Sequence, residues 1–186
     1  YAMSKYLNKA DKKTVTLFAD GAGAVILSPT KNNNGYMQSK LSTKGEYNGW
    51  MGIYHGGSHH PIDAQSIENH DNQLKFVKKI PTEINPKVWS DSILELCERQ
   101  KITPNDIQHY FFTQININTI FETMDILGED RKKAATIMHN YGYTGSACIP
   151  MALDEWVKKG KIKKGDIIAF VGSGGGLAFG SAIFKM

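Results

Sequence analysis

Short apolar runs and longer helical patterns alternate along this chain. Residues 14–19 and 24–27 are apolar runs on either side of a small-residue turn at 20–23, and they predict two strands. Residues 36–43 alternate polar and apolar side chains, which is typical of a half-buried strand. Residues 45–71 hold many Gly, His and Asn residues and little periodicity, so they predict a long excursion over the surface.

Three helices are predicted further along the chain. The first begins at Asn85-Pro86, a good pair for a helix start; the second begins near Asn116 and ends before Gly128. The third covers residues 148–159. Their apolar faces are formed by Trp89, Ile93, Leu96 and Cys97 in the first, Ile117, Ile120, Phe121, Met124 and Leu127 in the second, and Ile149, Leu153, Trp156 and Val157 in the third.

Three more apolar runs complete the pattern. Residues 107–112 predict a buried strand, and residues 166–172 and 178–184 predict two strands that close the chain around a glycine-rich segment. Strands interleaved with helices indicate an α/β fold with a mixed β-sheet packed with α-helices. Neither a linker nor a low-complexity tract interrupts the pattern, so we expect residues 1–186 to form one domain.

Charge and composition exclude some functions. The chain has 186 residues and a net charge of +4, and it contains no run of about 18 apolar residues that could cross a membrane. Five lysines gather at 158–164; they form either a solvated helix end or a docking patch for an acidic carrier protein or a phosphate-bearing thioester. Aromatic residues are not interleaved with these lysines, which argues against a nucleic-acid partner.

Cysteine and histidine usage gives no sign of a metal. Two cysteines, Cys97 and Cys148, form no disulfide framework, which fits a reducing cytoplasm, and Cys97 is expected to be a core residue. The group His55, His59, His60, Asp63 and His70 matches no recurrent zinc spacing. Residues 1–8 show no signal-peptide pattern and look like chain already inside a fold, so we expect the gene product to begin before Tyr1.

The glycine-rich segment Gly172-Ser173-Gly174-Gly175-Gly176 lies between two predicted strands. It lacks the Lys and Ser/Thr of a P-loop and is followed by a strand, so nucleotide binding is disfavoured. Glycines here leave backbone N–H groups open to a ligand, as an oxyanion hole requires. The same glycines also fit a tight hairpin that needs positive φ, and both interpretations stay open.

Four segments together resemble the β-ketoacyl-acyl-carrier-protein synthase III family. Asp20-Gly21-Ala22-Gly23-Ala24 is similar to the family's Gly-Asp-Gly-Ala-Gly-Ala motif, and Thr113-Gln114-Ile115-Asn116 stands where the family has His-Gln-Ala-Asn. Gly142-Tyr143-Thr144-Gly145-Ser146 stands where it has Gly-Asn-Thr-Ser. The fourth runs from Gly160 through the glycine segment to Phe179-Gly180-Ser181-Ala182. The segments follow the family's order and span essentially the whole chain.

The resemblance implies a fold and a set of partners. The family has a thiolase-like fold of two similar halves, and this chain resembles the C-terminal half, so the N-terminal half with the nucleophilic cysteine is expected elsewhere. Cys148 falls where the family has a small core residue. The implied substrates are thioesters of CoA or of the phosphopantetheine arm of an acyl carrier protein, with no further cofactor and no metal. The implied assembly is a homodimer in the cytoplasm.

The resemblance also points to site residues, with departures. It implies Gly175 as an oxyanion donor; Thr113 replaces the His and Tyr143 the Asn that stabilise the malonyl enolate in the family. Asn116 and Asn118 are the expected contacts of the thioester carrier, Asn118 standing where the family has an Arg that docks the carrier protein. His139 is either a substitute imidazole or a surface residue.

Three functions follow from these observations. The leading one is an acyltransferase of the synthase III kind in fatty-acid or related acyl metabolism, with a non-standard acceptor because Thr113 and Tyr143 depart from the family pattern; the isolated chain is expected to be inactive. The second is a non-catalytic thiolase-fold partner subunit. The third is a small-molecule binding domain that uses the same cleft without turnover.

Overall fold

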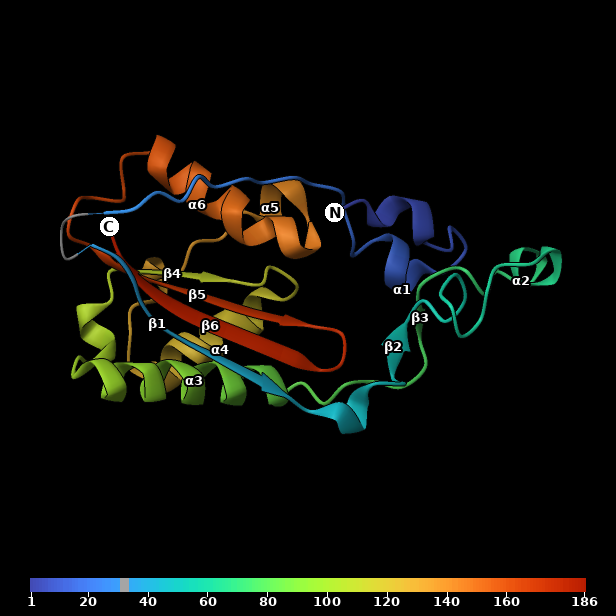
Figure 1. Cartoon of the computed structure of the whole chain (residues 1–186), viewed down its shortest axis with the longest axis horizontal. Coiled ribbons are helices and arrows are strands. Elements are labelled where there is room, and N and C mark those ends of the chain that lie inside the picture. The colour runs from blue at the N-terminus through green and yellow to red at the C-terminus, as the bar shows by residue number, and fades with distance from the viewer. Residues whose placement is uncertain (31–33) are drawn as a thin grey trace.

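A four-stranded mixed sheet forms the centre of the chain in the computed structural model, which describes residues 1–30 and 34–186. Its strands are β1 (Gly35–Thr43), β6 (Ala178–Lys185), β5 (Ile167–Gly174) and β4 (His109–Phe112), in that spatial order. Strand β6 runs antiparallel to both β1 and β5, whereas β4 runs parallel to β5. The predicted α/β fold with a mixed sheet is confirmed (Figure 1).

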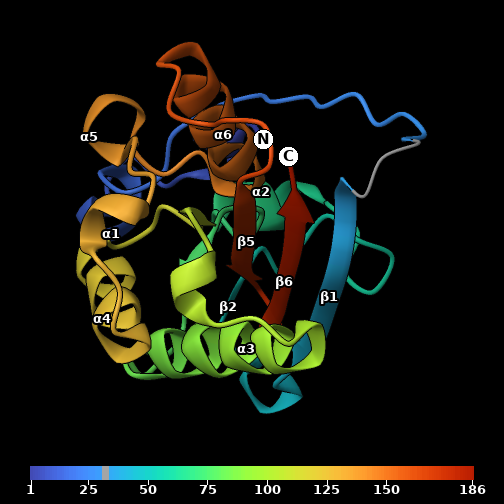
Figure 2. The ribbon, with the colours of Figure 1, turned by 90° about the vertical axis from the view of Figure 1, so that its left-hand side faces the viewer.

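Helices cover both faces of this sheet. α3 (Ile84–Gln100) and α4 (Ile117–Leu127) lie on one face, and α6 (Cys148–Lys158) lies on the other, as Figure 2 shows end-on. Successive side chains of a strand point to opposite faces. Tyr110 and Phe112 of β4 therefore enter the core beneath α3 and α4, while Phe111 packs with Trp156 of α6.

The three predicted helices are confirmed, although α3 begins at Ile84 after Glu83, so the expected cap Asn85 lies inside the helix. Asn116 caps α4 by accepting a hydrogen bond from the Asn118 N–H at 2.9 Å, and Gly128 ends that helix at φ 72°. In α6 the prediction of a buried Val157 is wrong, because this side chain faces away from the sheet and is 51% exposed.

The two strands predicted at 14–19 and 24–27 are wrong. Residues Lys12–Val15 form the short helix α1, which starts because the Asp11 side chain accepts a hydrogen bond from the Lys13 N–H. Residues 24–27 make no hydrogen bond with another described segment, and Val25, Ile26 and Leu27 are 61%, 97% and 80% exposed. A strand needs a partner strand, and the described residues offer none to this run.

The arm, residues 44–82, projects beyond the end of the sheet (Figure 1). It contains only short elements, as predicted for most of its length: η2 (Gly45–Tyr47), β2 (Met51–Gly52), α2 (Ala64–Glu68) and β3 (Lys75–Phe76), with β2 and β3 paired. The remaining short helices are η1 (Met3–Tyr6), η3 (Pro104–Asp106), η4 (Arg131–Lys133), α5 (Met138–Tyr141) and η5 (Gly145–Ala147). Among the described residues, no helix combines the length and the hydropathy needed to cross a bilayer.

Candidate active site

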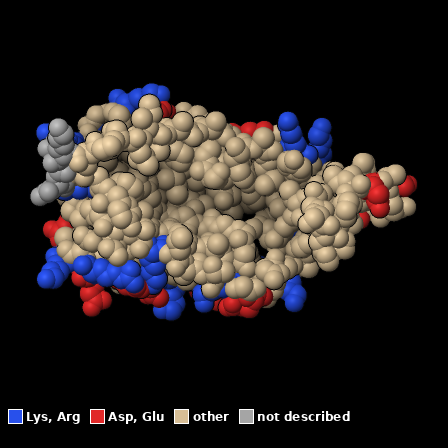
Figure 3. Space-filling view, in the orientation of Figure 1, with Lys and Arg blue, Asp and Glu red and all other residues tan. Residues whose placement is uncertain are grey.

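A pocket of about 980 Å³ lies where the β5–β6 turn, the end of β4, the segment before α6 and the arm come together. It brings together residues that are far apart in the sequence, including Thr113, Asn116, Tyr143 and Gly175. Figure 3 shows that the hollowed middle of this face is bordered by uncharged residues, while charged side chains gather along its margins. The pocket therefore offers a mostly apolar space with a few polar groups, as small-molecule sites do.

Thr113 follows β4 directly and is held on both sides. Its N–H donates to the Val171 carbonyl at 3.0 Å, which extends the pairing of β4 with β5. Its Oγ1 accepts a hydrogen bond from the Ser173 N–H, also at 3.0 Å. A threonine hydroxyl has one hydrogen to donate. Because Ser173 uses a lone pair of the oxygen, that hydrogen stays available to a ligand in the pocket.

Gly175 lies in the turn between β5 and β6, so the hairpin interpretation of the glycine segment is confirmed. Nothing in the described chain accepts a hydrogen bond from the Gly175 N–H, and a Cβ built there would meet no atom within 4 Å. An open N–H beside a pocket is the feature that oxyanion stabilisation requires. The hairpin and the oxyanion interpretations are therefore compatible.

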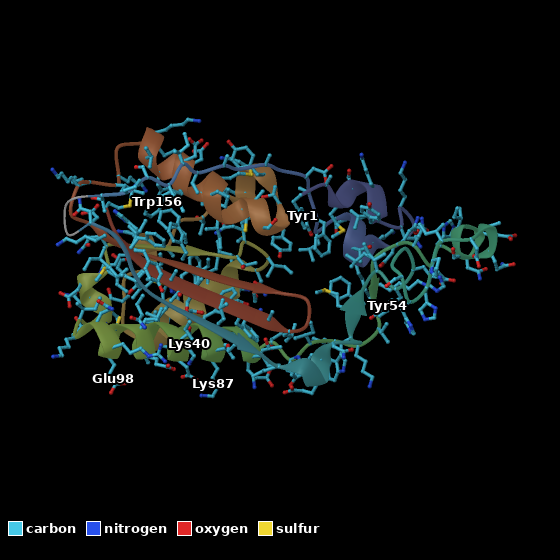
Figure 4. All side chains as sticks on the ribbon, in the orientation of Figure 1. Tyr1, Lys40, Tyr54, Lys87, Glu98 and Trp156 are labelled. Atoms are coloured by element: carbon cyan, nitrogen blue, oxygen red, sulfur yellow. The ribbon has the colours of Figure 1, made fainter. Side chains whose placement is uncertain are left out.

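Tyr143 belongs to an aromatic wall of the pocket, formed by Tyr1, Phe18, Phe76 and Tyr143. The Tyr143 ring lies 5.4 Å from Phe18 and 6.4 Å from Tyr1 between centroids, and Phe18 stacks on Phe76 at 6.2 Å. Figure 4 shows Tyr1 between the helices above the sheet and the arm. Burial, together with Cys148 and Tyr1 nearby, raises the pKa of Tyr143, so its phenol stays neutral and can donate a hydrogen bond.

The other predicted site residues separate into two groups. Asn116 lines the pocket while it caps α4. Asn118 is exposed in the first turn of α4 and is not among the pocket residues, and neither is His139, which is exposed on α5. Only Asn116 of the two predicted carrier contacts therefore faces the pocket.

Gln114 fixes the backbone beneath the site. Its side chain is 1% exposed and donates from Nε2 to the carbonyls of Phe112 and Ala135, at 3.0 and 2.9 Å. Its Oε1 accepts a hydrogen bond from the Ile137 N–H at 2.9 Å. One amide thereby ties the end of β4, where Thr113 lies, to the segment that leads towards Tyr143.

Both cysteines are buried and unsuited to nucleophilic attack. Burial raises the pKa of Cys97 to about 11, and its side chain belongs to the core beneath α3, as predicted. Burial also raises the pKa of Cys148, although its sulfur accepts a hydrogen bond from the Gln114 N–H at 3.4 Å. The thiolate is the nucleophilic form, so neither residue is prepared for thioester formation.

The lysine and histidine groups lie outside this pocket. Lys158 pairs with Asp154 at 2.6 Å and Lys159 with Glu155 at 2.8 Å, while Lys161 lies 4.2 Å from the Trp156 ring centroid. These lysines interact with their own helix, and the carrier-docking patch stays a prediction. Residues 1–30 and 34–186 contain no group of three His, Cys, Asp or Glu side chains arranged to hold a metal ion.

Comparison with known proteins gives the family. Residues 97–186 match the model described as 3-oxoacyl-[acyl-carrier-protein (ACP)] synthase III C terminal, and residues 1–45 match the model described as 3-oxoacyl-[acyl-carrier-protein (ACP)] synthase III. The chain belongs to the 3-oxoacyl-[acyl-carrier-protein] synthase III family. The resemblance drawn from the four sequence motifs is therefore confirmed, and with it the thiolase-like fold.

Relatives and solved structures agree on this family. The β-ketoacyl-[acyl-carrier-protein] synthases III of Clostridioides difficile and Fusobacterium nucleatum are 31% and 33% identical over 98% of this chain. Each match covers only about half of the relative, 55% and 56%. The structure of the synthase III from Thermus thermophilus has a TM-score of 0.85 and 27% identity, covering 100% of this chain and 56% of that one. The Aquifex aeolicus synthase III has a TM-score of 0.84 at 23% identity, covering 99% and 55%.

Several pocket residues escaped the sequence analysis. Leu74, Phe76 and Ile80 line the pocket from the end of the arm, a part of the chain for which no element was predicted. The alternation of Leu74 and Phe76 with Lys75 is a weak strand signal, since it covers only a few residues and is broken by Val77. The aromatic wall could not be predicted, because its four rings come from four separate places in the sequence.

Proposed function

We propose that the protein is an acyltransferase of the synthase III kind that acts on acyl-CoA or acyl-carrier-protein thioesters in fatty-acid or related acyl metabolism. The proposal includes a nucleophilic cysteine in an N-terminal half outside residues 1–186. The curated relatives support it by their names, and about half of their length is matched by this chain. The single observation that carries the proposal is that the free Gly175 N–H and the Thr113 hydroxyl belong to one mostly apolar pocket.

The chemistry follows from the charge that develops during acyl transfer. A cysteine thiolate attacks the thioester carbonyl, the oxygen becomes negative, and the carrier leaves as a thiolate when the carbonyl re-forms. The Gly175 N–H is a preorganised donor for that oxygen. Thr113 and Tyr143 are neutral donors that would orient the acceptor in the second half of the reaction, and Asn116 would contact the carrier arm.

A non-standard acceptor is the second part of the proposal. Thr113 cannot become a cation, and the Tyr143 ring, packed on Phe18, occupies space that a smaller amide would leave open. Replacing both residues, Thr113→His with Tyr143→Asn, is expected to raise malonyl-thioester decarboxylation by about tenfold or more, the scale of one well-placed donor or proton-transfer group. Release of labelled CO₂ measures this, with each single variant as a control. No rise in the double variant would show that these positions do not define the acceptor.

The intact mass of the full-length gene product after incubation with a panel of acyl-CoAs tests acyl transfer directly. We expect one acyl group per chain, removed by hydroxylamine, on a cysteine outside residues 1–186. Cys148→Ser should leave the adduct in place, because the Cys148 thiol is buried and protonated. An adduct that disappears in this variant would assign the nucleophile to Cys148 instead.

A non-catalytic partner subunit is the second candidate function. The observation that favours it is the loss of both family enolate ligands, since Thr113 and Tyr143 replace the His and the Asn. Absence of an adduct with every acyl-CoA would support this candidate over the acyltransferase. The homodimeric assembly and the cytoplasmic location stay predictions.

A further inference from the structure

Lys79 is the one charged side chain among the described residues that line the pocket. It lies at the end of the arm, just after β3, in a lining that otherwise consists of apolar, glycine and neutral polar residues. Lys79 is exposed at the edge of this lining, where a single positive charge beside uncharged walls attracts anions that enter the pocket. The pocket therefore has one point at which it favours an anion.

The ammonium of Lys79 is free, unlike those of its neighbours. Lys75 pairs with Asp71 at 2.5 Å, and the Lys78 Nζ lies 5.3 Å from the Trp50 ring centroid. Within the described ranges no carboxylate lies within ion-pair distance of Lys79, including that of Glu83, four residues along the chain. Its charge is therefore available to a ligand.

Two uncharged polar side chains line the pocket next to Lys79 in the sequence. Thr82 and Asn85, at the start of α3, both belong to the lining, and neither side chain has a hydrogen-bond partner in the described chain. A hydroxyl and an amide supply donors that suit phosphate oxygens alongside an ammonium. In the same pocket lining, Thr113 and Gly175 supply donors suited to a thioester oxygen.

We propose that Lys79 binds the phosphate at the 4′ end of the pantetheine arm of the thioester substrate, the group that CoA and acyl carrier proteins share. This inference rests on the proposed acyltransferase function. The pantetheine arm itself is uncharged and has amide groups, which matches the uncharged remainder of the pocket lining. Lys79 is thus a residue that selects phosphorylated carriers over simple thiols.

Binding of 4′-phosphopantetheine and of pantetheine to the full chain, measured by calorimetry at low salt, tests this assignment. The wild-type chain is expected to prefer the phosphorylated ligand by about five- to tenfold, the scale of one charge-assisted contact. Lys79→Ala should abolish that preference without changing the affinity for pantetheine, and Lys79→Arg should retain most of it. The preference should shrink as the salt concentration rises, because the contact is ionic.

Lys87→Ala is the matched control. Lys87 pairs with Asp91 at 2.9 Å on the outer side of α3, away from the sheet (Figure 4). Its replacement by Ala changes the net charge of the protein by the same amount as Lys79→Ala. We expect wild-type behaviour from it. An equal loss in Lys87→Ala and Lys79→Ala would show a general charge effect and overturn the assignment.

The remaining outcomes separate this inference from the function beneath it. If Lys79→Ala keeps the preference for 4′-phosphopantetheine, Lys79 does not bind the phosphate, although the pocket still binds the arm. If the variant weakens CoA binding but not 4′-phosphopantetheine binding, the lysine contacts the nucleotide and the assignment is wrong. If the wild-type chain shows no measurable binding of pantetheine, 4′-phosphopantetheine or CoA, both the inference and the thioester site are overturned.

Discussion

Gly175→Val is expected to lower kcat/KM for acyl transfer by about 10²-fold or more, the scale of losing one oxyanion donor. The valine side chain would stand beside the open N–H of the one β5–β6 turn residue, among those described, that combines an open N–H with a place in the pocket lining, and would crowd the approach of the thioester oxygen. The fold should survive, because a Cβ at this position meets no atom within 4 Å and the residue does not require positive φ. Thermal melting together with the rate of adduct formation on the full-length protein measures both effects.

Gly57→Val is the matched control for this experiment. Gly57 lies in the arm, also has open space around a built Cβ and does not line the pocket. Its variant should react at the wild-type rate. If Gly175→Val also reacts at the wild-type rate, the Gly175 N–H is not an oxyanion donor, and the glycine turn has a purely structural role.

Gln114→Leu is expected to destabilise the fold by about 2–4 kcal/mol, because it leaves two buried carbonyls and one buried N–H without the amide that pairs with them. Leucine has nearly the volume of glutamine, so the loss comes from the unpaired polar groups rather than from a cavity. This is a large part of the 5–15 kcal/mol, roughly, that stabilises a domain. Urea unfolding at equilibrium measures the change.

Gln65→Leu provides the comparison. Gln65 is exposed on α2, and its side chain bonds only to Asn69 on the same short helix, at 3.1 Å. Its loss should cost less than about 0.5 kcal/mol, as surface substitutions usually do. If the two variants unfolded at the same urea concentration, Gln114 would not hold the end of β4 in place.

The helices of this fold could be predicted because their signals are local. The apolar spacing of Trp89, Ile93 and Leu96 lies within α3, and Gly128, which ends α4, directly follows its last apolar side chain, Leu127. Strand pairing is a non-local property. The run at 24–27 has the composition of a strand, yet its state depends on whether another strand lies beside it, which no local pattern contains.

The site followed from the sequence only through the order of the family motifs. Thr113, Tyr143 and Gly175 line one pocket, but they come from different parts of the chain. Thr113 follows β4, Tyr143 follows α5, and Gly175 lies between β5 and β6, so no sequence periodicity links them. Lys79 and Phe76 were missed because the arm carries no regular pattern long enough to assign. Gln114 could be placed in a family motif from the sequence alone. That its side chain holds two segments together became evident only from its hydrogen bonds in the structure.

The bare run of Val25, Ile26 and Leu27 has a consequence for handling the molecule. Its three side chains are exposed, and its backbone N–H and C=O groups have no partner in another described segment. Another β-strand with an unpaired edge can therefore form hydrogen bonds with it. Strand β1, one of the two edge strands of the sheet, offers such a free side. In concentrated solutions of this polypeptide by itself, we therefore expect pairing between copies through this run and the edge of β1.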